Sequence, residues 1–134
     1  MKNEKGANPL TDVVDNIVST LLPKATMNRS FFVNDIPDWF QLGENSETVT
    51  SVIGDLLSTA VHFAKESCIW LSARLYGNVI LLHVKCSNGF HCRTIEARLR
   101  NLQLLAERSR GTVGLTTWQN HVTSLTFGFS NNNF

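Results

Sequence analysis

The sequence predicts an α+β fold, a two-layer α/β sandwich in which a mixed, mostly antiparallel sheet of about five strands has three helices on one face. Two observations predict it. Three segments carry apolar residues at helical spacing, and short strand-like segments lie between them, mainly as antiparallel pairs. The order helix, strand, helix, hairpin, helix, hairpin buries every apolar stripe with the least crossing of the chain.

The first half of the chain contains the central element of the prediction. A helix begins at Pro9 and ends near Pro23, residues 29–36 form a strand, and the apolar residues of 37–45 cover the core as a loop. The segment 45–66 is then the central helix, with Asn45 or Ser46 as its cap. Its stripe comprises Val49, Val52, Ile53, Leu56, Leu57, Ala60, Phe63 and Ala64.

The second half predicts two hairpins around a third helix. Strands 68–76 and 79–86 are joined by a turn at Gly77-Asn78, and Trp70 faces away from the apolar side of its strand. The third helix begins at Thr94, and Gly111 suits a left-handed position just past its end. Strands 112–118 and 122–129 follow, with their turn at 119–121.

Length and composition limit the classes of protein. The 134 residues predict a flexible lead-in at 1–8, one domain at 9–130 and a frayed tail at 131–134. Twelve basic and eleven acidic residues give a net charge of +1, which argues against a nucleic-acid partner. No apolar run reaches the ~18 residues of a membrane span, and no secretory signal is evident. The odd number of cysteines predicts reduced thiols, and we expect a cytoplasmic protein.

These segments together resemble a known family. Between about Leu10 and Phe129 the chain is similar to the ATP-binding domain of sensor histidine kinases and their relatives among the Hsp90, gyrase and anti-sigma-factor ATPases. The resemblance rests on the lead helix LTDVVDNIVSTLLPKA, the strand RSFFVNDIP, the helix VTSVIGDLLSTAVHFAKE, the hairpin IWLSARLYGNVILLHVKCSNG and the ending LRNLQLLAERSRGTVGLTTWQNHVTSLTFGF. It implies this fold and a role in bacterial-type two-component signalling.

The resemblance also places the nucleotide site. In the family, an asparagine on the central helix ligates magnesium; the pattern puts Thr59 there, with Asp55 where a preceding asparagine is common. A family aspartate accepts the adenine amino group, but Cys86 or Ser87 stands at that place, followed by Asn88 and by Gly89 as the only remaining glycine. Losing a charged acceptor typically costs ~1.5–3 kcal/mol.

A family loop that closes over the triphosphate is shortened here to Phe90-His91-Cys92-Arg93. Arg93 and the amides at the helix start still suit an anion. We therefore interpret Asp55, Thr59, Cys86, Ser87, Asn88, Gly89 and Arg93 as a vestigial nucleotide pocket.

The expected function is a non-catalytic module, a pseudokinase, with no cofactor and no metal, that acts through a protein partner or self-association and is regulated by a tether to a longer sensor. The alternative is a weak or altered Mg-ATP-binding histidine or serine kinase domain.

Other polar residues allow further hypotheses. Phosphotransfer is disfavoured because the first helix contains no histidine. Cys86, His91 and Cys92 fit no standard zinc spacing, and thiols without a ligand role are favoured. The basic third helix is interpreted as a solvated face, with docking of an acidic partner or a phosphate as the alternative; its arginines are Arg93, Arg98, Arg100, Arg108 and Arg110. Trp70 marks a contact surface if it lies on the outer face of the sheet.

Overall fold

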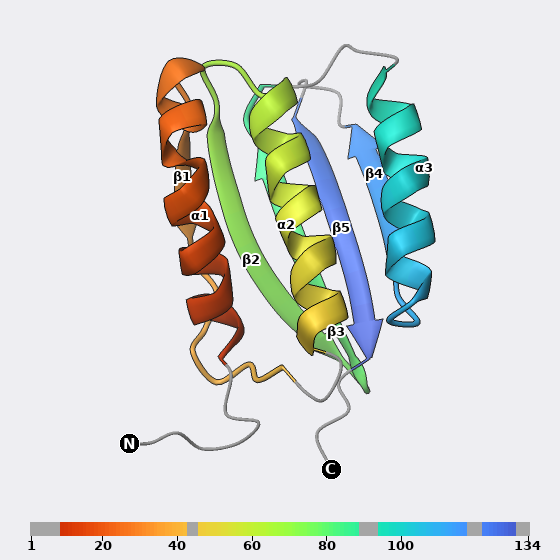
Figure 1. The fold of residues 1–134 in the computed structure, drawn as a ribbon. Coiled ribbons are helices and arrows are strands. Elements are labelled where there is room, and N and C mark those ends of the chain that lie inside the picture. The colour runs from red at the N-terminus through yellow and green to blue at the C-terminus, as the bar shows by residue number, and fades with distance from the viewer. Residues whose placement is uncertain (1–8, 43–45, 89–93, 118–121, 131–134) are drawn as a thin grey trace.

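The fold is a single open sheet with one layer of helices (Figure 1). The computed structural model describes residues 9–42, 46–88, 94–117 and 122–130. Its elements are α1 (Leu10–Met27), β1 (Phe31–Asn34), α2 (Ser46–Phe63), β2 (Cys68–Tyr76), β3 (Val79–Cys86), α3 (Thr94–Glu107), β4 (Thr112–Thr117) and β5 (Thr123–Ser130). The three helices lie side by side over the same face, which confirms the predicted fold class.

The sheet has five strands in the order β1-β2-β3-β5-β4. β1 pairs with β2 in parallel, and the other three pairs are antiparallel. The parallel pair requires a crossover, and α2 supplies it by running from the end of β1 back to the start of β2. The sheet is therefore mixed and mostly antiparallel, as the sequence predicts.

The core lies between α2 and the sheet. The predicted stripe of α2 is buried from Val49 to Ala64, with Phe63 partly exposed. The helix ends at Phe63, three residues before the predicted end at Glu66. Glu66 has φ 50°, a left-handed conformation that turns the chain out of the helix and into β2.

α1 continues through Pro23, so the predicted end of this helix near Pro23 is wrong. Proline lacks an N–H and removes one helical hydrogen bond, but Pro23 itself is exposed. Continuation is favoured because Ala25, in the next turn, is buried in the core with 1% exposure. The Asn28 amide then donates to the Lys24 and Ala25 carbonyls, and this satisfies the end of the helix.

Gly111 has a different role from the predicted left-handed cap. The residue with positive φ after α3 is Arg110, at 58°. A Cβ at Gly111 would lie 2.5 Å from the Gly128 carbonyl oxygen and 2.7 Å from the Phe127 ring. Glycine is required here because β5 approaches the backbone closely, and the left-handed prediction is wrong.

The predicted boundaries of the hairpin β2–β3 are confirmed, and those of β5 are shifted by one residue. The first strand is two residues shorter at each end than the predicted 29–36. The loop after β1 covers the core as expected, because Phe40 and Leu42 are buried. Trp39 stacks on Phe40 with a centroid separation of 4.0 Å and stays 60% exposed. The predicted lead-in at 1–8, Asn45, Trp118, the turn at 119–121 and the tail at 131–134 lie outside the described residues.

Candidate nucleotide site

Thr59 and Asp55 lie one turn apart on α2, which runs along the middle of the helix layer. The Thr59 hydroxyl donates to the Asp55 carbonyl oxygen at 2.7 Å, and Thr59 is only 1% exposed. Asp55 is exposed. The hydroxyl that would stand in for the magnesium ligand is therefore buried and bonded to its own helix.

At the end of β3, Cys86 is fully buried. Burial, and secondly the nearby Cys68, raise the pKa of the Cys86 thiol to about 12. A thiol of that kind stays protonated at neutral pH, so it offers neither a carboxylate-like acceptor for an adenine nor a reactive thiolate.

Ser87 and Asn88 are bonded to the connection between α2 and β2. The Ser87 hydroxyl accepts the Cys68 amide at 2.9 Å and lies 3.2 Å from the Ser67 hydroxyl. The Asn88 side-chain amide donates to the carbonyl oxygens of Lys65 at 3.0 Å and Glu66 at 2.7 Å. These two side chains hold the left-handed turn at Glu66 in place, a structural role that sequence reasoning missed.

The structure brings the predicted residues into two groups. Asp55 and Thr59 lie on α2, whereas Cys86, Ser87 and Asn88 lie at the end of β3 and contact the residues that follow α2. Gly89 and Arg93 fall outside the described residues, as do His91 and Cys92 of the disfavoured metal hypothesis. Within 9–42, 46–88, 94–117 and 122–130, no group of three His, Cys, Asp or Glu residues could hold a metal ion.

A cluster of positive charge lies at the C-terminal end of α2, near this site. Burial, followed by the charges of Lys24, Arg98 and Lys65, lowers the pKa of His62. His62 Nδ1 lies 3.3 Å from Lys24 Nζ. The cluster joins all three helices, because Lys24 belongs to α1, Lys65 follows α2 and Arg98 belongs to α3.

Trp70 lies on the face of the sheet opposite the helices and is 43% exposed. The condition under which it would mark a contact surface is thus met. The only direct signal in the sequence was its alternation away from Ile69 and Leu71, which are both buried.

Comparison with solved structures shows that this open sheet with three helices on one face is the fold of histidine kinase catalytic domains. The Acinetobacter baumannii histidine kinase AdeS superposes with a TM-score of 0.80 at 11% identity, over 99% of this chain and 70% of that one.

Two further structures agree. The nucleotide-free catalytic domain of histidine kinase ThkA gives a TM-score of 0.73 at 9% identity, with 92% of each chain covered. The mycobacterial sensor histidine kinase MprB gives 0.71 at 10% identity, over 91% of this chain and 94% of that one. No protein-family model matches the sequence, and no curated protein matches it. At these identities the likeness establishes the fold.

No helix among the described residues is both long and apolar enough to cross a membrane.

Proposed function

We propose that this chain is a histidine-kinase-like ATPase module with a degenerate ATP site, which acts in signalling through contacts with a protein partner or a second copy. The observation that supports this proposal best is that the polar side chains of the site already bond to the protein's own backbone. Thr59 bonds to the backbone of α2, and Asn88 bonds to the carbonyl oxygens after α2. The Thr59 hydroxyl is buried, the Asn88 side-chain N–H groups are already bonded, and Cys86 and Ser87 provide no carboxylate.

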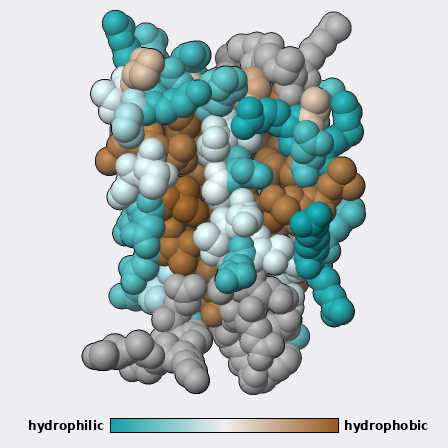
Figure 2. All heavy atoms as spheres, viewed as in Figure 1, coloured by the Kyte–Doolittle hydropathy of each residue, from teal (hydrophilic) through white to brown (hydrophobic). Residues whose placement is uncertain are grey.

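The surface of the helix layer supports the proposed protein contact. Figure 2 shows hydrophobic side chains gathered over α1 and over α3, on either side of a paler strip. Leu22 and Met27 of α1 are 48% and 83% exposed, and Leu104 of α3 is 65% exposed. Exposed apolar residues of this size are common at protein interfaces. Histidine kinase ThkA, which has this fold, has been solved in complex with the response regulator protein TrrA.

Titration calorimetry with ATP and ADP, with and without magnesium, tests the degenerate site. We expect no saturable heat of binding up to about 1 mM nucleotide. A thermal-shift measurement at the same concentration gives a second readout, because a ligand with a Kd of ~0.1 mM would raise the melting temperature measurably. A magnesium-dependent binding curve would contradict the proposal.

Sedimentation equilibrium of the same protein tests self-association, and Leu104→Glu on the exposed face of α3 should weaken any dimer that forms through the helix layer.

The alternative is weak Mg-ATP binding, and one observation favours it. Lys24, Lys65 and Arg98 place positive charge beside the candidate site, where triphosphate would be attracted. Under this alternative, Arg98→Gln weakens ATP binding, and Arg108→Gln at the other end of α3 leaves it unchanged. ShkA, another neighbour of the same fold with a TM-score of 0.74, has been solved with the nucleotide analogue AMPPNP.

A further inference from the structure

The face of the sheet without helices carries a pattern of side chains that the nucleotide fold does not require. Strand register places Trp70 of β2 beside Lys85 of β3 and Ser124 of β5 in one row across this face. The next row contains Ser72 and His83, and Arg74 follows one step further along β2. On β2 the small Ser72 thus alternates with the large Trp70 and Arg74, and Ser124 places a second small residue on β5.

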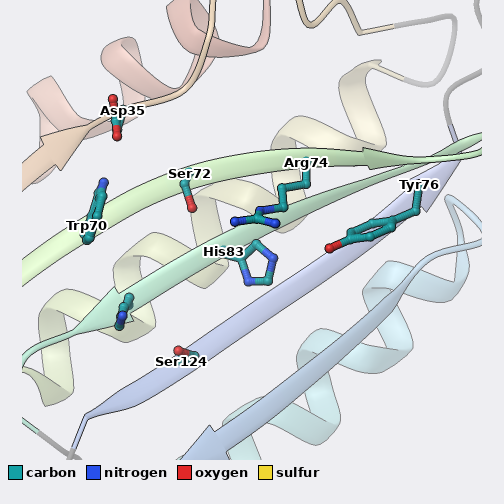
Figure 3. Close-up of a pocket in the computed structure, with 8 residues that line it drawn as sticks. Asp35, Trp70, Ser72, Arg74, Tyr76, His83 and Ser124 are labelled. Carbon is teal, nitrogen blue, oxygen red and sulfur yellow. The ribbon is translucent and has the colours of Figure 1, made fainter.

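This alternation produces a pocket of about 440 Å³ on the outer face (Figure 3). Ser72, His83 and Ser124 line its floor, and Trp70 and Tyr76 stand toward its two ends. The Arg74 guanidinium and the Tyr76 hydroxyl point toward the middle of the pocket, where His83 lies. A volume of this size holds a small organic molecule, since ligand pockets run from about 300 to 1,000 Å³.

The charges of the pocket are mainly positive. Arg74 and Lys85 both line it, and across the part of the chain that the structure describes neither has a carboxylate within ion-pair distance. Asp35 is the acidic residue of the lining, and it lies at the Trp70 end. Two cations that have no acidic partner among the described residues, beside an imidazole and the hydroxyl of Tyr76, form a set of donors that matches a phosphate or carboxylate group.

The aromatic residues extend the site beyond an anion. Trp70 and Tyr76 are 43% and 55% exposed, so their rings are available to a flat ligand. The Lys85 ammonium lies over the Trp70 ring, 5.7 Å from its centroid, which holds that cation at the aromatic end of the pocket. A ligand ring that packs against Trp70 therefore lies near Lys85, and one that packs against Tyr76 lies near Arg74.

We propose that this pocket binds a small organic anion in which a phosphate or carboxylate is attached to a flat ring. Arg74 holds the anionic group, His83 and Tyr76 donate further hydrogen bonds to it, Lys85 adds positive charge at the Trp70 end, and the ring packs against Trp70 or Tyr76. The site is separate from the candidate nucleotide site, because the sheet lies between the pocket and the helix layer. It does not depend on whether the proposed degenerate ATP site is correct.

Phenyl phosphate is the first probe, compared with inorganic phosphate and phenol in an NMR titration of the ¹⁵N-labelled full chain up to about 10 mM. We expect saturable shifts in the Trp70 indole N–H and in the amides of β2, β3 and β5. Phenyl phosphate should bind at least several-fold more tightly than either half-molecule, and benzoate tests whether a carboxylate serves as well. An absence of saturation, or shifts confined to α2 and α3, would overturn the assignment. Equal binding of inorganic phosphate would overturn the aromatic part.

Charge variants separate a built site from general attraction. Arg74→Gln should weaken phenyl phosphate binding about tenfold, the usual effect of losing a charged hydrogen bond. Arg100→Gln on exposed α3 makes the same change in net charge and should have no effect. Asp35→Asn should strengthen binding, since it removes the negative charge from the lining. Equal weakening by Arg74→Gln and Arg100→Gln would refute the site.

A second readout follows the imidazole of His83. Arg74 and Tyr76 from β2, Lys85 from β3 and Asp35 after β1 are the titratable groups that share its pocket. A bound anion favours the imidazolium, so saturating phenyl phosphate should raise the His83 pKa in an NMR pH titration. An unchanged pKa at saturation would place the anion elsewhere. Nucleotide binding that is lost in Arg74→Gln but does not require magnesium would belong to this pocket and would leave the degenerate ATP site standing.

Discussion

Replacing Thr59 by asparagine introduces the residue type that the resemblance to histidine kinases would place here as a magnesium ligand, and the structure predicts that this substitution costs stability. Thr59 is 1% exposed and its hydroxyl already bonds to the Asp55 carbonyl. Asparagine brings a larger amide that can make four hydrogen bonds, of which that carbonyl satisfies one. A buried polar group without a partner costs about 1–3 kcal/mol, and added volume in a packed site costs a similar amount. We expect Thr59→Asn to lose about 2–4 kcal/mol in total.

Urea unfolding, followed by circular dichroism, measures this loss as a lower midpoint with an unchanged slope. Thr59→Val is the matched control: it removes the hydroxyl but keeps the shape, and the Asp55 carbonyl retains its helical partner. Its unfolding free energy should change by less than about 1 kcal/mol. Unchanged stability of Thr59→Asn would contradict this expectation, above all if the variant also gains magnesium-dependent ATP binding, because an open polar pocket would then exist at this position.

Three other expectations follow from packing and titration. Gly111→Ala should destabilise the protein by about 1–3 kcal/mol, because its Cβ would lie 2.5 Å from the Gly128 carbonyl oxygen. Gly54→Ala, whose Cβ would have nothing within 4 Å, should stabilise α2 by about 0.5–1 kcal/mol. Thermal unfolding of the two variants distinguishes these effects. Burial, then the charge of Arg74, lowers the pKa of His83 below its usual value of 6.5. The free energy of unfolding should therefore be unaffected by His83 above pH 6.5 and should fall as the pH drops from 6.5 toward the folded-state pKa. Arg74→Gln should raise the His83 pKa, as an NMR titration will report. Cys86, with its pKa raised to about 12, should resist alkylation by iodoacetamide in the folded protein and react after addition of urea. Peptide mass mapping separates its labelling from that of Cys68 and Cys92, and rapid labelling at Cys86 itself would contradict its burial.

The sequence predicts the fold well where local pattern and tertiary packing agree. The stripe of α2 is such a case, and so is the hairpin β2–β3, whose Gly77 has a φ of 57° in the turn. Prediction fails where a distant contact decides. Pro23 signals a helix end locally, but Ala25 is drawn into the core and the helix continues. Gly111 signals a left-handed position, but the approach of β5 is what requires glycine there.

The candidate nucleotide site is harder to predict because the same residue types serve ligands and turns. The resemblance puts Cys86 or Ser87 at the adenine position, with Asn88 next to it. Ser87 instead bonds to Cys68 at the start of β2, and Asn88 bonds to Glu66, more than twenty positions earlier in the chain. No short-range pattern contains that contact. The pocket on the outer face was missed for a related reason: Lys85 and Ser124 become neighbours only through the pairing of β3 with β5.

The order of strands also has a consequence for how the chain folds. β2 with β3 and β4 with β5 are hairpins whose innermost pairs, Tyr76↔Val79 and Thr117↔Thr123, close short loops. Phe31↔Cys68, the first pair of β1 with β2, joins residues 68 − 31 = 37 positions apart, and closing that loop costs more entropy. We expect the hairpins to form early and β1 to join the sheet late. Pulsed hydrogen exchange during refolding should then protect the amides of β3 before those of β1, and the four-residue edge strand should be the first part of the sheet to open in the native protein.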